Sequence, residues 1–450
     1  MTDGQKRQQR QKWQLGPAWV GAFVLLGAAP SVARSQQLAP AERGLASYVD
    51  AHSADALALL ERVVNINSGT MNPAGVRDVG RIFQAQYDSL GFTTRWVDGS
   101  AWHRAGLLIA EHPGRGPKVV LIGHLDTVFE QTSPFQRFEL LPDSMASGPG
   151  VIDMKGGDVV MLLALKTLKA QGLLDRLNVT VVLHGDEEES GNPLELARRD
   201  LIAAGKGADA AIGFEDGDGD PRTAVIARRG FTGWDLYVKG TPAHSSLIFR
   251  DEVGAGAIYE AARILNGFYE ELHTEPYLTF NPGSILGGSA VRFDDAQSGG
   301  TAFGKTNIVA ESTVVAGDLR TLSREQRERT KARMQAIVAE HLPHTDAELT
   351  FRDTYPPMAP TDGNKRLLAM YDQASEDLGL GPVTAVDPAN AGAADVSFVA
   401  DEVPMVIDGV GLMGSGGHTV HETANLRTFP TQTKRAAVLL YRLTAVKPQP

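Results

Sequence analysis

The stretch that decides the fold is Val179-Thr180-Val181-Val182-Leu183-His184-Gly185-Asp186-Glu187-Glu188-Glu189-Ser190-Gly191. Its first part is a β-branched, apolar run, which predicts a buried strand. Its second part places several carboxylates at the mouth of that strand, where like charges repel and burial penalises each ionised group unless a cation offsets it. A solvated acidic turn is the alternative interpretation of this stretch alone. The choice depends on the other candidate ligands in the chain.

The composition sets the outer limits of the interpretation. A chain of 450 residues is too long for one ordinary core, so two domains are expected. The 42% hydrophobic and 22% charged content is that of a soluble globular protein. The absence of cysteine excludes disulfides, thiolate metal sites and a cysteine nucleophile. A formal charge of −11, with no basic block in the folded part, argues against nucleic acid as a partner.

The N-terminal residues have the pattern of a secretory signal. Basic residues from Lys6 to Lys12 precede a short apolar region from Pro17 to Ala29, and Ser31-Val32-Ala33 offers small residues for cleavage. The apolar region is short for a membrane span, although an uncleaved anchor is the alternative. We therefore expect residues 1–33 to be a signal peptide, the protein to be exported to the periplasm or beyond, and no membrane contact after cleavage.

A second strand end carries a histidine and an aspartate. Val119 to Gly123 is a continuous apolar run, which suits a central strand covered on both faces, and His124-Leu125-Asp126 follows it. Residues i and i+2 share a face in extended chain, so Asp126 can hold the His124 imidazole while the other ring nitrogen binds a metal. A hydrogen-bonded surface histidine is the alternative, but the C-terminal edge of an open α/β sheet is where ligands bind.

Two further acidic residues complete the pattern. Asp153 lies in a glycine-rich loop, residues 148–157, just before a predicted buried helix at Asp158 to Leu168. Glu215 follows a short predicted strand at Ala208 to Phe214. Asp153 alone could be a helix-entry carboxylate. Together with His124 and the glutamate pair, however, these residues place candidate ligands on four successive strand or loop ends.

The chain resembles a metallopeptidase of the glutamate carboxypeptidase type, a family of carboxypeptidases, dipeptidases and aminoacylases. The resemblance extends over essentially the whole chain after the signal segment. The matching motifs are Gly123-His124-Leu125-Asp126-Thr127, Gly150-Val151-Ile152-Asp153-Met154-Lys155-Gly156-Gly157, Asp186-Glu187-Glu188, Gly213-Phe214-Glu215, Gly240-Thr241-Pro242-Ala243-His244-Ser245 and Gly416-Gly417-His418-Thr419.

The resemblance implies a site with two metal ions. One metal would be held by His124 and Glu215 and the other by Glu188 and His418, with Asp153 as the bridge and Glu187 as the general base. Histidine and carboxylate ligands without thiolate suit two Zn²⁺, with Co²⁺ or Mn²⁺ as alternatives. Two such ions can activate a bridging water and polarise a carbonyl. His421 also follows the glycines, but the family's ligand lies four residues before a glutamate, and that spacing selects His418.

The implied fold is an α/β zinc exopeptidase fold, an open mixed sheet flanked by helices, with an inserted α+β domain. We expect the catalytic domain at 34–227 and 346–450 and the inserted domain at 228–345. Alternating segments at Phe231 to Gly240 and Asn307 to Arg320 predict strands, each leading into a helix. The family uses such a domain as a lid and a dimerisation surface, which implies a homodimer. Residues 289–305 depart from the family pattern and indicate an extra polar hairpin or loop.

The resemblance also assigns roles to residues of the inserted domain. His244 would reach the active site, from its own chain or from a partner subunit, and stabilise the tetrahedral oxyanion. Asn307 and Arg320 match the family's carboxylate-binding positions. The alternatives are a structural hydrogen bond for His244 and a pairing of Arg320 with Asp318 or with a helix end. Asp395 fits either the family's aspartate beside the metal ligands or a plain helix cap.

These observations predict an exported dizinc hydrolase that cleaves an amide bond next to a C-terminal amino acid with a free carboxylate. Its substrate would be a small peptide or an N-acyl amino acid. An N-acyl-amino-acid amidohydrolase or a dipeptidase is the alternative within enzymes. A non-catalytic, metal-stabilised binding protein is the alternative outside them, but it would require loss of Glu187 or of a ligand, and all are present.

Overall fold

The computed structural model describes residues 38–294 and 299–446. The predicted signal peptide therefore lies outside the described residues, as does the tip of the predicted hairpin. Among the helices of the described ranges, none combines the length and the apolar character that a membrane span needs.

The catalytic part is built on a mixed six-stranded sheet in the order β1-β2-β6-β3-β7-β16. Strands β6, β3, β7 and β16 run parallel, whereas β1 and β2 pair antiparallel at one edge. The strands are β1 (Thr93–Asp98), β2 (Gly106–His112), β3 (Lys118–His124), β6 (Asn178–His184), β7 (Ala210–Gly213) and β16 (Val406–Ile407). The open mixed sheet predicted from the sequence is thus confirmed.

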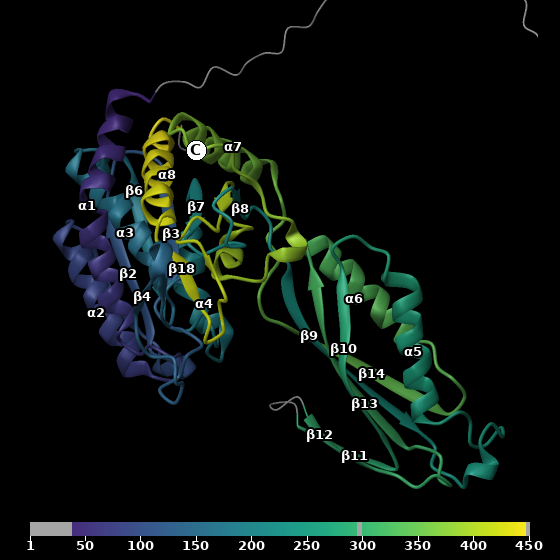
Figure 1. Cartoon of the computed structure of the whole chain (residues 1–450). Coiled ribbons are helices and arrows are strands. Elements are labelled where there is room, and N and C mark those ends of the chain that lie inside the picture. The colour runs from purple at the N-terminus through teal and green to yellow at the C-terminus, as the bar shows by residue number, and fades with distance from the viewer. Residues whose placement is uncertain (1–37, 295–298, 447–450) are drawn as a thin grey trace, which may run out of the picture. The chain divides into compact units, whose positions relative to one another are not determined.

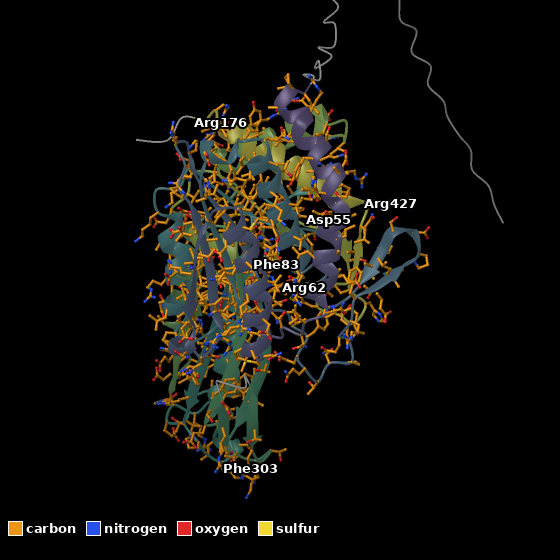
Figure 2. All side chains as sticks on the ribbon, turned by 90° about the vertical axis from the view of Figure 1, so that its left-hand side faces the viewer. Asp55, Arg62, Phe83, Arg176, Phe303 and Arg427 are labelled. Carbon is orange, nitrogen blue, oxygen red and sulfur yellow. The ribbon has the colours of Figure 1, made fainter. Side chains whose placement is uncertain are left out.

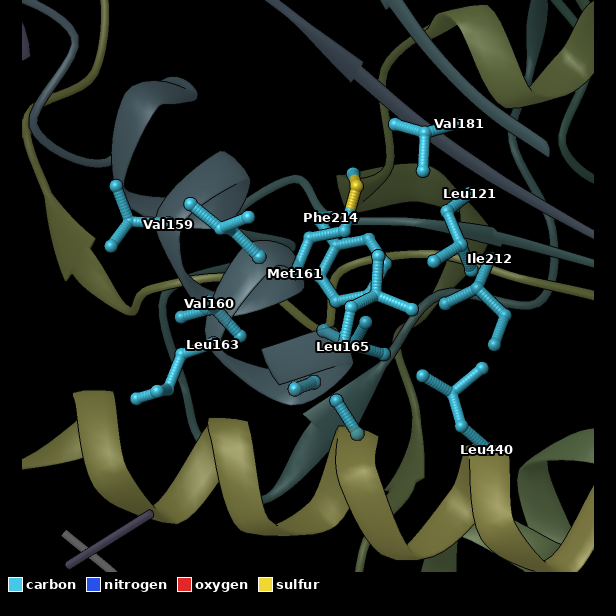
Figure 3. Close-up of a cluster of buried hydrophobic side chains, with 14 of the residues drawn as sticks. Leu121, Val159, Val160, Met161, Leu163, Leu165, Val181, Ile212, Phe214 and Leu440 are labelled. Carbon is cyan, nitrogen blue, oxygen red and sulfur yellow. The ribbon is translucent and has the colours of Figure 1, made fainter. Parts of the chain in front are cut away.

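Both faces of this sheet are buried. In β3, Val119 and Leu121 belong to one core cluster, whereas Val120 and Ile122 belong to the other. Figure 3 shows the first cluster, in which side chains of α3 (Lys155–Ala170) fill the space between the sheet and α8 (Thr428–Leu443). The helices over that face are α1 (Pro40–Val64), α2 (Pro73–Ser89), α3 (Lys155–Ala170) and α8 (Thr428–Leu443), and α4 (Leu194–Gly205) covers the other face. Successive side chains of a strand point to opposite faces of the sheet. Because both faces are buried here, apolar residues occupy consecutive positions, which explains the continuous apolar runs.

Residues after β8 (Thr223–Ala224) form an inserted domain with its own core. Its antiparallel sheet has the order β10-β13-β9-β14, and two helices pack on it (Figure 1). Trp234 and Phe268 meet edge to face in this core, with ring centroids 6.0 Å apart. The elements are β9 (Gly230–Gly240), α5 (Ala257–Leu272), β10 (Thr279–Gly288), β13 (Ser312–Thr321), α6 (Arg324–Val338) and β14 (Thr345–Asp353).

The inserted domain differs from the expectation in two respects. Its sheet has four strands where two were expected, and it continues through β14 to Asp353, past the expected boundary at 345. Its return segment, residues 354–358, leads to α7 (Asp362–Asp377) of the catalytic part. The strand predicted at Phe231 to Gly240 is confirmed as β9. The strand predicted from Asn307 begins only at Ser312, because the residues from Asn307 to Glu311 lie in a loop.

The extra segment at 289–305 does form a hairpin, with strands β11 (Ala290–Asp294) and β12 (Gly299–Phe303) paired antiparallel. Phe303 of this hairpin is 64% exposed, whereas Phe83 is buried in the core of the catalytic part; Figure 2 labels both residues. The remaining short strands are β4 (Glu139–Leu141), β5 (Met145–Ser147), β8 (Thr223–Ala224), β15 (Thr384–Ala385), β17 (Gly414–Ser415) and β18 (Thr423–Asn425).

Candidate metal centre

The candidate ligands converge because three parallel strands end at one edge of the sheet. His124 is the last residue of β3 and pairs in register with His184, the last residue of β6. Glu187 and Glu188 follow β6, and Glu215 follows β7. Carboxyl ends of parallel strands meet at the same sheet edge, which is where open α/β folds bind ligands. The geometry therefore follows from the topology.

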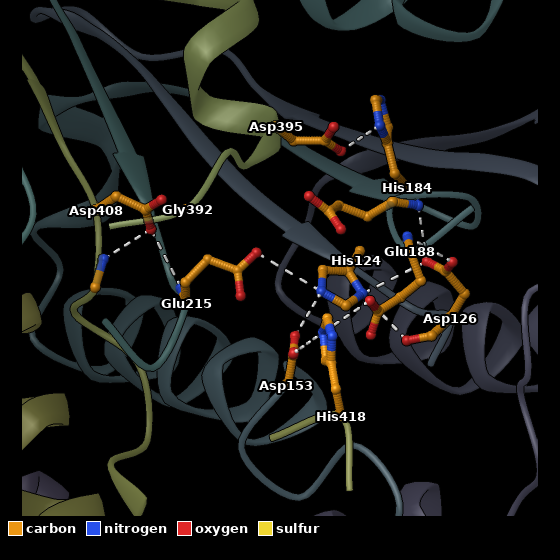
Figure 4. A network of polar contacts seen from close by, with 12 residues as sticks. His124, Asp126, Asp153, His184, Glu188, Glu215, Gly392, Asp395, Asp408 and His418 are labelled. Atoms are coloured by element: carbon orange, nitrogen blue, oxygen red, sulfur yellow. Dashed lines mark hydrogen bonds and ion pairs between the residues drawn. The ribbon is translucent and has the colours of Figure 1, made fainter. Parts of the chain in front are cut away.

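Five side chains form two groups that share one carboxylate, and Figure 4 shows them from close by. In the first group, His124 Nε2 lies 3.1 Å from Asp153 Oδ1 and 3.6 Å from Glu215 Oε1. In the second, His418 Nε2 lies 2.9 Å from Asp153 Oδ2 and 3.0 Å from Glu188 Oε2. Within each group the ligand atoms lie within 4.8 Å of one another. The grouping matches the ligand sets implied by the resemblance, while metal coordination itself stays a prediction.

The pKa values of these groups indicate an excess of negative charge. Burial raises the pKa of Glu187 well above its ordinary value, and the charge of Asp395 adds to the rise. Burial also raises the pKa of Glu188, with Asp153 as the next cause. Hydrogen bonds to Asp153 and Glu188 raise the pKa of His418 to about 11. The imidazolium of His418 thus supplies positive charge at the position where a metal ion would supply more.

Asp126 organises the segment after β6 that carries Glu187 and Glu188, called the glutamate loop here, as well as the His124 ring. The carbonyl oxygen of Asp126 lies 3.1 Å from His124 Nδ1, and its Oδ1 lies 3.4 Å from the same nitrogen. The expected orientation of His124 is present, but the nearer partner is the backbone. The Asp126 carboxylate accepts from the Thr70 hydroxyl at 2.7 Å and from the backbone N–H groups of Glu187 and Glu188 at 3.1 and 3.2 Å. Asp126 therefore fixes where both glutamates leave the backbone.

Glu422, four residues after His418, holds the loop that carries Asp153. It is fully buried and accepts backbone N–H bonds from Gly150 at 3.1 Å, Ile152 at 2.9 Å and Asp153 at 3.3 Å. Burial raises the pKa of Glu422 to about 8. From the sequence, Glu422 was noted only for its spacing from His418. The structure shows that it also binds the backbone of the loop that carries Asp153. His421 is exposed and belongs to neither ligand group, as expected.

A buried network behind Glu187 was not predicted. Arg198 is fully buried and donates to Asp395 Oδ1 at 2.7 Å and to Asp186 Oδ1 at 3.0 Å. The other carboxylate oxygen of Asp395 lies 2.5 Å from Nδ1 of His184, as Figure 4 shows. Asp395 makes no helix-capping bond. The sequence left two interpretations of Asp395, an aspartate beside the metal ligands and a helix cap. Its position beside the glutamate loop agrees with the first.

The residues assigned to substrate contacts lie on the inserted domain. His244 and Asn307 are exposed neighbours, joined by the Ser245 N–H bond to the Asn307 carbonyl oxygen at 2.9 Å. His244 Nδ1 lies 2.9 Å from Ser246 Oγ. Arg320 Nε donates to Asp318 at 2.9 Å, and its guanidinium lies 4.4 Å from the centre of the Phe231 ring. Within the described ranges, no hydrogen bond or ion pair joins these three residues to the ligand groups.

Arg320 does, however, line a cavity. The cavity has a volume of about 590 Å³ and lies on the inserted domain, with Phe231, Asn281 and Asp318 also in its wall. The pairing of Arg320 with Asp318, which was the alternative interpretation, is present. Because the side chain of Arg320 remains about a third exposed, it can still donate to an anion.

The donor set fits divalent cations. Imidazole nitrogens and carboxylate oxygens without thiolate are ligands that zinc accepts, and three protein ligands would leave a four-coordinate ion one further position. Several carboxyl groups with raised pKa values, held together at one edge, are stabilised when cations replace the protons that burial otherwise favours.

Comparisons with known proteins show which family and fold the chain shares. A family model described as Peptidase family M20/M25/M40 matches residues 120–442. The chain is 26% identical over 400 residues to Carboxypeptidase G2 of Pseudomonas sp. (strain RS-16), covering 86% of this chain and 89% of the relative. It is 24% identical over 388 residues to the succinyl-diaminopimelate desuccinylase of Acidovorax ebreus (strain TPSY), covering 82% and 93%. Aminopeptidase PepT from Bacillus cereus ATCC 10987 has a similar fold, with a TM-score of 0.69, 18% identity, and coverage of 87% and 98%.

Proposed function

The chain belongs to peptidase family M20/M25/M40, and from this premise we propose that it is a carboxypeptidase-type amidohydrolase that releases a C-terminal amino acid with a free carboxylate. Membership of the family makes it a hydrolase acting on amide bonds. The observation that carries the finer proposal is the pair of ligand groups sharing Asp153, with Glu187 beside them and outside both.

We propose Zn²⁺ as the native metal at both positions, held by His124, Asp153 and Glu215 on one side and by Asp153, Glu188 and His418 on the other. The donor types support this choice, and Co²⁺ or Mn²⁺ are the alternatives. When bound, such ions lower the pKa of water and polarise the scissile carbonyl.

In this proposal Glu187 is the general base. Among the described residues its carboxylate forms no hydrogen bond or ion pair, so it is available to a water molecule. Burial raises the pKa of Glu187 well above its ordinary value, which makes its carboxylate a stronger proton acceptor than an exposed glutamate. Glu187 would accept the proton of the attacking water and return it to the amine nitrogen as the C–N bond breaks. This division of labour requires Glu188 to stay a ligand.

The inserted domain would bind the substrate carboxylate and close over the site. Arginine suits this task because its fork donates two parallel hydrogen bonds to a carboxylate, and Arg320 already lines a cavity. Asn307 would add a donor, and His244 would stabilise the oxyanion after closure, from the same chain or from a partner subunit. A homodimer formed through the inserted domain is part of the proposal.

We further propose that the protein is exported, with residues 1–33 as its signal. The basic start, the short apolar region and the small residues before position 34 support this. Accordingly we propose small peptides or N-acyl amino acids as its partners, and neither nucleic acid nor a membrane surface. The similarity to a desuccinylase supports N-acyl amino acids as the second substrate class to test.

The decisive experiment compares acids with amides. The zinc-loaded protein is assayed on a library of N-acyl amino acids and of blocked and unblocked dipeptides, each also as its C-terminal amide. Wild type should strongly prefer the acids. Arg320→Ala should lose that preference, with kcat/KM on acids falling by roughly thirtyfold or more, the scale of about 2 kcal/mol for a truncated charged contact. Arg333→Ala, an exposed arginine paired with Glu271 on the same domain, is the matched control.

Two outcomes would change the conclusion. Equal hydrolysis of acids and amides by wild type would contradict the carboxypeptidase proposal and favour an aminopeptidase-like activity. Failure to hydrolyse any member of the library, in a protein that binds two metal ions, would favour the non-catalytic alternative.

A further inference from the structure

The chain crosses between the catalytic part and the inserted domain through two segments that pair with each other. These segments, residues 228–231 and 354–358, are called the hinge ribbon here. Arg228 and Met358 exchange backbone hydrogen bonds of 2.9 Å in both directions, and the Phe231 N–H donates to the Tyr355 carbonyl oxygen at 2.9 Å. A side chain at Gly230 would lie within 2.6 Å of the backbone at Pro357, so glycine permits this close approach.

The returning segment of the hinge ribbon is attached to the glutamate loop. The Tyr355 hydroxyl donates to the carbonyl oxygen of Glu187 at 2.9 Å. The same hydroxyl accepts from Arg198 Nη2 at 3.0 Å and lies 3.1 Å from Ser190 Oγ. Its ring packs against Phe398, with centroids 5.0 Å apart. The hydroxyl is therefore held in place from several sides, and it donates its one hydrogen bond to the backbone carbonyl of Glu187, the proposed base.

The outgoing segment is attached to the neighbouring ligand. Arg228 is buried and donates from Nε to Asp408 Oδ2 at 2.9 Å, and Nη1 donates to the Gly392 carbonyl oxygen at 2.8 Å. The other oxygen of Asp408 accepts the backbone N–H of Glu215 at 3.3 Å, a contact that Figure 4 shows. Each segment of the hinge ribbon thus reaches the backbone of a residue whose carboxylate belongs to the site.

We propose that the hinge ribbon couples the position of the inserted domain to the geometry of the site, with Tyr355 and Arg228 as positioning residues for Glu187 and Glu215. Both attachments end on main-chain atoms, so any movement of the hinge ribbon displaces the backbone that carries these carboxylates. A general base tolerates little displacement, since a misplacement of about 1 Å can cost a hundredfold in rate. The inference rests on the proposed roles of Glu187 and Glu215.

The first test uses Tyr355→Phe, which keeps the ring and its packing and removes only the hydroxyl. In the zinc-loaded protein we expect kcat on the preferred acid substrate to fall by about tenfold or more, with KM and metal content unchanged. Tyr371→Phe is the control, because Tyr371 is also buried and its hydroxyl contacts Gln432, outside the site. A raised KM together with a lowered kcat, or equal losses in both variants, would indicate a general structural effect and overturn the inference.

The second test does not depend on turnover. Amide hydrogen exchange is measured by mass spectrometry on the zinc-loaded wild type and variants. Tyr355→Phe should accelerate exchange in the peptide 184–191, and Arg228→Lys should accelerate it in the peptide 210–216. Tyr371→Phe and Arg222→Lys, the latter an exposed arginine, should change neither. Unchanged exchange in both peptides would overturn the inference, even if wild type hydrolysed no amide and the proposed function itself had failed.

Discussion

Replacing Arg198 by methionine should destabilise the protein by about 3–5 kcal/mol, the cost typical of breaking a buried ion pair from one side. Arg198 has no exposed surface, and it donates to two carboxylates, Asp395 and Asp186. Methionine fills much of the same volume but donates no hydrogen bond. Each carboxylate left without its donor costs about 1–3 kcal/mol, so the two together account for the expected loss.

The measurement is urea unfolding of metal-free protein in the presence of a chelator, because bound metal would add its own stabilisation. Arg199→Met is the matched control. Arg199 is the next residue on the same helix, its side chain is 62% exposed, and its pairing with Asp200 should be worth at most about 1 kcal/mol. The two variants make the same chemical change at adjacent positions that differ in burial.

The loss should also depend on pH. Without Arg198 the two buried carboxyl groups would have raised pKa values, and a carboxyl whose folded pKa is raised lowers stability only above its unfolded pKa, near 4. The Arg198→Met loss should therefore be smaller at pH 5 than at pH 8. Equal unfolding free energies for the two variants, or a loss independent of pH, would refute the assignment of Arg198 as the support of the glutamate loop.

Three further predictions concern the site itself. Glu188→Gln should lose bound zinc, whereas Glu187→Gln should keep both ions and lose turnover; equal metal loss, measured by elemental analysis, would contradict the separate roles. His244→Ala should lower kcat by roughly two decades with unchanged metal content, and a near-normal kcat would leave it a structural residue. Because the pKa of His418 is raised to about 11, the stability that its imidazolium contributes to the metal-free protein is fully present below about pH 6.5 and is lost as the pH rises through 11. Thermal unfolding of metal-free His418→Gln should lack this fall, and a wild-type slope in that variant would exclude His418 as its source.

The sequence predicts the centre of the catalytic sheet well because β3, β6 and β7 are buried on both faces. A continuous apolar run such as Val119 to Gly123 has no competing interpretation once glycine and proline bound it. Strand β10 was not predicted. It contains Pro282 and Gly283, residue types that are rare inside strands, and the structure accommodates them as an irregularity at a sheet edge. Strand β14 did carry a signal, since Ala347, Leu349 and Phe351 alternate and pack against the inserted core.

The convergence of the candidate ligands was predictable, and the residues that support them were not. His124, Asp153 and Glu215 lie in short motifs whose order specifies where they meet. Arg198, in contrast, lies on an amphipathic helix, where an arginine normally faces water, and its partner Asp395 is 197 residues away. No local pattern in a single sequence links such a pair, because only the folded topology brings them together. Glu422 was predicted in part. Its spacing from His418 was noticed in the sequence, but its hydrogen bonds to the loop that carries Asp153 were not.

The two chain crossings, which pair at Arg228 and Met358, also make the inserted domain a segment that can be replaced as a whole by the corresponding domain of a relative. Both ends of the insertion lie side by side, so a relative's domain can be grafted through two neighbouring junctions without opening the catalytic core. Where the junctions are cut then decides what is inherited. A chimaera joined outside residues 228–358 would import the donor's hinge ribbon, whereas one joined between Phe231 and Thr354 keeps Arg228 and Tyr355 with the residues that they contact in this chain. On the roles proposed above, substrate preference and catalytic alignment would then be recombined separately.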